Sequence, residues 1–71
     1  MPLYYFHLRG RTERELDLDG LDLPSDDDAA VQATKAVREL REEFSAEDWT
    51  GWVLEVVDED GREVLRLPIT F

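Results

Sequence analysis

The sequence predicts an α+β fold, ββαββ, in which a four-stranded antiparallel sheet has one helix packed across one face. Three observations predict it. Large residues alternate with period two near the start, one long segment carries apolar residues at helical spacing, and two apolar runs flank the sequence DEDG near the end. At 71 residues the chain has room for a single domain, 1–71.

The first expected strand is LYYFHLR, Leu3 to Arg9. Side chains alternate across a strand, so one face is wholly aromatic or aliphatic and is typical of a core: Tyr4, Phe6 and Leu8. The opposite face mixes ring and charge and holds the only histidine of the chain: Tyr5, His7 and Arg9. The size and mixed chemistry of these side chains raise the question of whether this second face binds a partner.

A second, weaker strand is expected over residues 12–18, as the partner of the first strand in an antiparallel hairpin. Its alternation predicts that Leu16 and Leu18 point inward and that Glu13, Glu15 and Asp17 point outward. Asp19-Gly20 then breaks or bulges the strand before the chain reaches Pro24.

The helix is the most strongly indicated element. Ser25 is a good N-cap, and Asp28 completes a capping box. Three aspartates in the first turn suit the positive end of the helix dipole. The expected apolar stripe consists of Ala30, Ala33, Val37, Leu40 and Phe44. We expect Trp49 to cover the Phe44 end of this helix.

Two further strands are expected over residues 52–57 and 62–69, joined by Asp-Glu-Asp-Gly. Only an even loop length collects the apolar residues on one face, so we expect a four-residue loop with a left-handed Gly61, or a two-residue one. Glu55 would then face Val64, and Val53 would face Arg66. The expected strand order is second, first, fourth, third, although Pro68 disfavours a strand paired on both edges.

The net charge of −10 disfavours nucleic-acid binding and favours basic protein surfaces. It is concentrated in residues 12–28, where eight acidic residues stand against Arg14 alone. The chain has no cysteine, no leader-like segment before Tyr4 and no apolar run of the ~18 residues that a bilayer span needs. We therefore expect a soluble, cytoplasmic protein with no membrane contact.

The sequence gives no sign of a catalytic or metal-binding site. No nucleophile or acid pairs with His7 in the sequence pattern, although Arg9 and Glu55 could lie near it on the same sheet face, and zinc would need further ligands. Both Asp-Gly segments place glycine at position 4 of a would-be calcium loop, which needs it at position 6. We expect no enzyme, no catalytic residue, no cofactor, no metal and no small-molecule substrate.

A candidate interaction face lies opposite the helix and consists of Tyr5, His7, Arg9, Arg62 and Arg66, beside Val53, Val57 and Val64. It could bind a protein partner, pair with itself in a homodimer, or be an ordinary solvated sheet face. An alternative is a nucleic-acid-binding regulator that stacks a single strand on Tyr5. A further alternative is an acidic nucleic-acid mimic, in which residues 13–28 bind a basic partner.

Four features together resemble a small bacterial family filed as domain of unknown function 6894. They are YYFHLR, the segment with Asp17, Gly20 and Leu23, an alanine-rich helix, and LEVVDEDGREVLRLP. The resemblance covers nearly the whole chain, and the opening motif is its most specific part. It implies a domain of about 70 residues with the ββαββ order, and no activity, cofactor or catalytic residue. The Arg11-Thr12 turn departs from the family's more usual acidic, glycine-containing turn.

Overall fold

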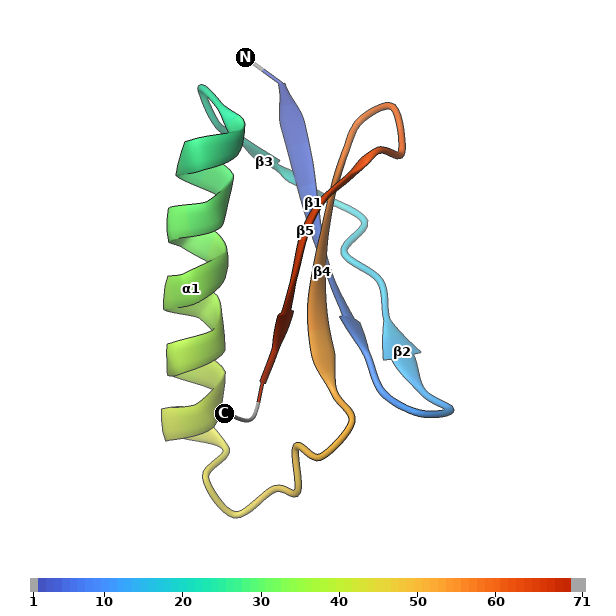
Figure 1. Ribbon diagram of the computed structural model, residues 1–71, viewed down its shortest axis with the longest axis vertical. Helices are drawn as coiled ribbons and strands as arrows, with labels where there is room; N and C mark the ends of the chain where they lie inside the picture. Colours follow the sequence, from blue (N-terminus) through green and yellow to red (C-terminus); the bar gives the residue numbers. More distant parts are fainter. Residues whose placement is uncertain (1, 70–71) are drawn as a thin grey trace.

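The computed structural model describes residues 2–69 and confirms an α+β domain with one helix on an antiparallel sheet (Figure 1). Its elements are β1 (Leu3–Arg9), β2 (Arg14–Glu15), β3 (Leu21–Asp22), α1 (Asp26–Glu43), β4 (Val53–Asp58) and β5 (Glu63–Pro68). The sheet order is β2-β1-β4-β5, and the short β3 also pairs with β1. Within this part of the chain, no helix is long and apolar enough to cross a membrane.

The predicted strand order is wrong. The strand after the helix, β4, lies beside β1, and β5 forms the edge of the sheet. Pro68 gives the physical reason, because proline has no N–H to donate and is tolerated at an edge. The helix therefore returns the chain to the middle of the sheet, and the last hairpin extends the sheet outward.

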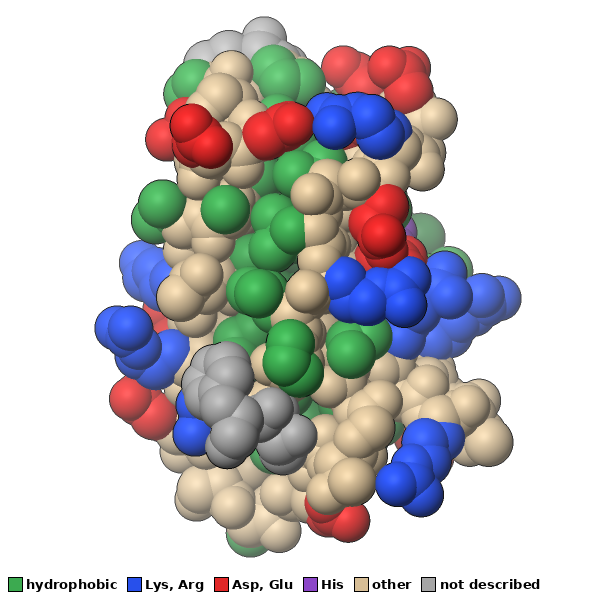
Figure 2. Space-filling model, in the orientation of Figure 1, with side chains coloured by type: hydrophobic (Ala, Val, Ile, Leu, Met, Phe, Trp, Pro, Cys, Tyr) green, Lys and Arg blue, Asp and Glu red, His purple; other side chains and the backbone are tan. Residues whose placement is uncertain are grey.

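The core lies between α1 and one face of the sheet, as the alternation of β1 predicts. Tyr4 is 3% exposed, and Phe6 and Leu8 pack against the buried cluster. The fully enclosed members of this cluster come from α1, β4 and the end of the sheet: Ala29, Ala33, Val37, Leu54, Val56 and Ile69. Figure 2 shows apolar side chains along the seam between helix and sheet.

The expected strand over residues 12–18 is reduced to two residues, and its predicted orientation is wrong. Leu18 is 84% exposed and Leu16 is 49% exposed, so neither points inward. The chain leaves β1 after β2 and pairs with it again at β3, beyond Gly20, whose φ of 75° is left-handed. Between these strands the carboxylate of Asp17 accepts backbone N–H groups in place of a strand ladder.

The helix begins as predicted. The Ser25 side chain accepts the Asp28 N–H, and its hydroxyl donates to the Asp28 carboxylate at 2.8 Å. The buried stripe starts at Ala29, one residue before the predicted Ala30. Phe44 caps the C-terminal end and is 44% exposed, so the stripe ends half in solvent.

Trp49 covers this end of the helix, as predicted. Its indole N–H donates to the Phe44 carbonyl at 3.2 Å, and its ring meets the Trp52 ring edge-on with centroids 5.9 Å apart. The Trp52 ring in turn lies so close to Gly10 that a Cβ there would come within 2.8 Å of it. Glycine at this position allows the loop after β1 to pack on the indole.

The turn of the last hairpin differs from the prediction. Asp58 N–H donates to the Arg62 carbonyl at 2.9 Å, so the loop is residues 59–61, an odd length, and Gly61 is left-handed as expected. A register shift at Val64 then restores the apolar pairing, with Leu54 opposite Leu67. Val64 itself packs against the core and leaves the outer side of the sheet.

Candidate interaction site

The sheet face turned away from α1, here called the outer face, is assembled from three strands. Strand pairing places Tyr5 beside Val57, His7 beside Glu55, and Glu55 beside Arg66. Its members are Tyr5, His7, Arg9, Val53, Glu55, Val57, Glu63 and Arg66. Figure 2 shows basic and acidic side chains gathered together on the side of the molecule away from the helix.

Glu55 lies at the centre of the outer face and is only 6% exposed. Two arginines hold its carboxylate: Arg9 Nε lies 3.2 Å from Oε1, and Arg66 Nη2 lies 3.0 Å from Oε2. A buried carboxylate is tolerated when it is paired and hydrogen-bonded on both oxygens. The prediction that Glu55 faces Val64 and Val53 faces Arg66 is wrong, because the bulge moves Arg66 opposite Glu55 and Pro68 opposite Val53.

Arg66 links this buried pair to a second carboxylate at the sheet edge. Its guanidinium also donates to Glu63 at 2.7 Å and 3.0 Å. The hydrogen bonds to Glu63, followed by the attraction of Glu55, raise the pKa of Arg66. The outer face thus carries two arginines and two glutamates, and its formal charges cancel on a chain whose net charge is −10.

The rings of Tyr5 and His7 stack beside this ion-pair network. Their centroids are 6.3 Å apart and their planes are inclined by 14°. Gly20 lies against Tyr5, since a Cβ there would come within 3.0 Å of the phenol ring. His7 Nδ1 accepts the backbone N–H of Asp17 at 3.0 Å and so ties the crossing segment to β1.

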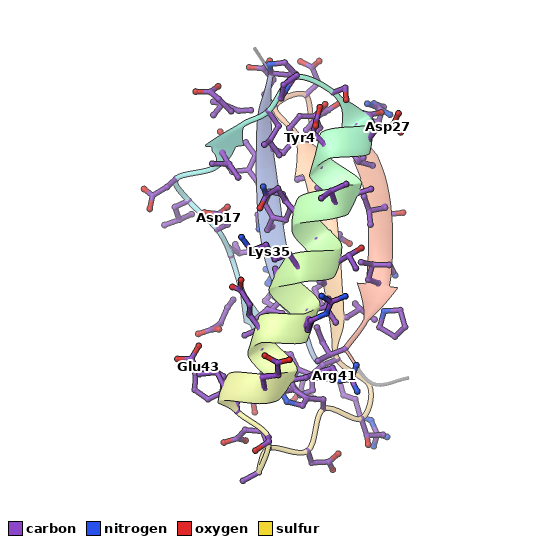
Figure 3. The ribbon with its side chains drawn as sticks, turned by 90° about the vertical axis from the view of Figure 1, so that its left-hand side faces the viewer. Tyr4, Asp17, Asp27, Lys35, Arg41 and Glu43 are labelled. Carbon is purple, nitrogen blue, oxygen red and sulfur yellow. The ribbon has the colours of Figure 1, made fainter. Side chains whose placement is uncertain are left out.

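Asp17 completes this attachment with its side chain (Figure 3). Its carboxylate accepts the backbone N–H groups of Phe6, Asp19 and Gly20 at 3.1–3.2 Å. Partial burial raises the pKa of Asp17, but these N–H donors and the nearby His7 outweigh it and hold the pKa below its ordinary value. The segment between β2 and β3 is therefore fastened to β1 by one histidine and one aspartate.

Arg62 does not join the outer face. Its guanidinium pairs with Asp26 at the start of α1 and with Asp58, each at 2.9 Å. Hydrogen bonds to Asp26 and then Asp58 raise the pKa of Arg62. The pairing of Arg62 with Asp26 fastens the last hairpin to the helix. Tyr4 in β1 also binds Asp26, because its hydroxyl donates to the carboxylate at 2.8 Å. Of the predicted interaction face, the structure thus brings together Tyr5, His7, Arg9 and Arg66, and it places Arg62 elsewhere.

Sequence reasoning placed Glu55 near His7 on this face but did not predict that two arginines hold it, and it missed the role of Asp17. The available signal for Glu55 was an acidic residue in the middle of the apolar run VLEVV. Across residues 2–69, no group of three or more His, Asp or Glu side chains is placed to hold a metal ion. What the arrangement offers chemically is a set of paired charges and stacked rings, which suits recognition of another surface.

These features define a small α+β domain whose outer sheet face carries a charge-balanced network around a buried glutamate. The chain belongs to the family described as Domain of unknown function (DUF6894), whose model matches residues 3–70. The family resemblance seen in the sequence is thereby confirmed. The same comparisons found no matching curated protein and no matching solved structure.

Proposed function

We propose that this protein is a small, non-enzymatic interaction module that self-associates through its outer face into a homodimer. The observation that carries the proposal is the neutral, ring-bearing network on a chain of net charge −10. Two such chains repel one another through most of their surface. This repulsion is small at the outer face, because its arginines and glutamates balance.

A two-fold contact between identical faces is self-complementary when each face carries both charges. Arg9 and Arg66 are 44% and 53% exposed at their side chains, and Glu63 is 48% exposed. A guanidinium has five N–H donors, so each arginine can keep its own glutamate and still donate to Glu63 of a second copy. Stacked Tyr5 and His7 supply ring surface beside these charges.

Edge-to-edge pairing is a poorer route to a dimer. One edge of the sheet is β5, which contains Pro68, the bulge at Val64 and the charged Glu63 and Arg66, and the opposite edge consists of the two-residue strands β2 and β3. Each of these features discourages a further strand from adding to an edge. The proposal therefore uses the face of the sheet and leaves its edge free.

Nucleic-acid binding has less support. Arg9, Arg62 and Arg66 are each paired with carboxylates, so a phosphate backbone would have to displace those partners. The role of residues 13–28 as a nucleic-acid mimic stays a prediction. We also propose a cytoplasmic location, with which the cysteine-free sequence is compatible.

Sedimentation equilibrium of Tyr5→Asp tests the proposal. The new carboxylate would lie beside Val57, two residues along β4 from Glu55, and would break the charge balance of the face in each copy. We expect the wild type to approach the mass of two chains at high concentration and Tyr5→Asp to remain a folded single chain by circular dichroism. Val31→Asp is the matched control, because Val31 is 67% exposed on α1. A folded Tyr5→Asp that keeps the wild-type mass, or a wild type that never dimerises, would overturn the proposal.

A further inference from the structure

We propose a second interaction surface, on the helix side of the sheet, that binds a basic peptide segment. It is a cleft of about 400 Å³ between the C-terminal end of α1 and β2, here called the tryptophan groove. Its apolar lining is Leu8, Leu40, Phe44, Trp49 and Trp52. In Figure 1 the C-terminal end of α1 and the strand β2 both lie in the lower half of the molecule.

The groove presents aromatic surface that the core does not fully enclose. Phe44 is 44% exposed, and Trp49 and Trp52 are half-buried. The two indoles meet edge-on, and the N–H of Trp49 already donates to the Phe44 carbonyl. What remains for a ligand is ring and aliphatic surface, which attracts apolar side chains and cations alike.

The rim of the groove is acidic. Its charged lining residues are Glu13, Arg14, Glu15, Glu47 and Asp48. Arg11 lies close enough to Asp48 to help lower its pKa, although the hydrogen bonds from Thr50 contribute most. With Arg11 counted, four carboxylates face two guanidinium groups, so the rim keeps a net negative charge.

Aromatic rings beside carboxylates are the chemistry that recognises lysine and arginine side chains. The cation lies against a ring face while its aliphatic stem covers apolar surface, and the acidic rim balances its charge. The net charge of −10 also steers a basic segment toward the molecule. The ligand that fits this groove is therefore a protein segment that carries lysine or arginine next to a large apolar residue.

The charge of the chain argues against other occupants. A nucleic acid, or a second copy of this acidic chain, would bring negative charge to a negative rim. The groove is also separate from the outer face, because Leu8 points to the opposite side of the sheet from its immediate neighbours in β1, His7 and Arg9. A partner could occupy the groove while the outer face is engaged in a dimer.

The tryptophans give a direct readout, because both tryptophans of the chain line the groove. The probe is a short, Trp-free synthetic peptide in which arginine and lysine alternate with leucine. We expect a saturable change in tryptophan fluorescence, with a Kd tighter than about 1 mM. Peptides with glutamine in place of the basic residues, or serine in place of leucine, should bind at least about tenfold more weakly.

Two protein variants separate the groove from general charge attraction. Glu47→Lys, at the rim, should weaken binding about tenfold, as should Phe44→Ala, which removes an exposed ring. Glu59→Lys is the control, since it makes the same charge change at an exposed turn position away from the groove. Circular dichroism checks that each variant is folded. Equal weakening by Glu47→Lys and Glu59→Lys, or no binding of the basic peptide to the wild type, would overturn the proposal.

Discussion

At the scale of single residues, Glu55 shows how a charge can lie inside a small sheet. It is 6% exposed, yet each carboxylate oxygen has an arginine within 3.2 Å. The arginines themselves stay about half exposed, so they keep much of their hydration. One guanidinium is enough to keep the buried carboxylate paired. Loss of both guanidinium groups would leave this carboxylate without a cation.

The first prediction is that Arg9→Ala and Arg66→Ala are strongly non-additive. Each single variant should lower the free energy of unfolding by about 1 kcal/mol, because the other arginine still holds Glu55. The double variant should lose about 3–5 kcal/mol, because it leaves a buried carboxylate without a cation. Urea unfolding measures all three, and adding Glu55→Gln to the double variant should restore part of the loss. Simple additivity of the two single effects would contradict this account of Glu55.

Asp17 gives a second prediction, for acid sensitivity. Its pKa in the folded protein lies below the ordinary value of 3.8, so the unfolded chain takes up the proton more readily. The stabilisation by Asp17 is therefore present above the ordinary pKa and is lost as pH falls through the lower, folded value. Asp17→Asn should cost about 1 kcal/mol near pH 7 and then lose less stability than wild type from about pH 5 to pH 3.

Urea titrations at several pH values provide the measurement for Asp17. Asp19→Asn is the control, because Asp19 lies in the same segment but its carboxylate holds none of the three N–H groups that Asp17 accepts. We expect this control to keep the acid sensitivity of the wild type. An Asp17→Asn variant as acid-sensitive as the wild type would mean that the fastening of β1 does not depend on this charge.

At the scale of elements, the predictions succeeded where a segment's own periodicity decides its structure. β1 and α1 have the predicted identity because alternation and helical spacing are local properties. The prediction of a strand over residues 12–18 failed because the Asp17 carboxylate accepts backbone N–H groups that would otherwise pair between strands. The strand order failed because pairing between distant strands leaves little trace in either strand alone.

The same reasoning explains what could be predicted of the site. Parity within β1 and β5 correctly put Tyr5, His7, Arg9 and Arg66 on one face. It could not place Glu55 opposite Arg66, because the bulge at Val64 shifts the register by one residue and strand alternation alone does not predict a bulge. Arg62 lies away from the outer face because its guanidinium pairs with Asp26 of α1 and with Asp58.

The helix start gives a prediction at this scale. Ser25→Ala removes the hydroxyl that accepts the Asp28 N–H and donates to its carboxylate, and should lower the free energy of unfolding by about 1 kcal/mol. Ser45→Ala, at an exposed position after the helix, should change it by less than about 0.5 kcal/mol. Chemical denaturation followed by circular dichroism compares the two. Equal effects at both serines would contradict a specific capping role.

At the scale of the whole molecule, charge distinguishes the two surfaces that we propose bind partners. The outer face is neutral and suits a second copy of the same acidic chain, whereas the acidic tryptophan groove suits a basic segment. Salt should therefore act on them in opposite directions. Screening weakens the repulsion between two chains of charge −10, and it also weakens the attraction of a cationic peptide.

Self-association through the outer face is tested most directly by amide chemical shifts in a ¹H–¹⁵N dilution series of the wild-type protein. The account predicts shifts that change with concentration and cluster around Tyr5, His7, Glu55 and Arg66, while Val31 on the exposed side of α1 stays constant. Spectra that do not change on dilution, or changes confined to α1, would contradict it.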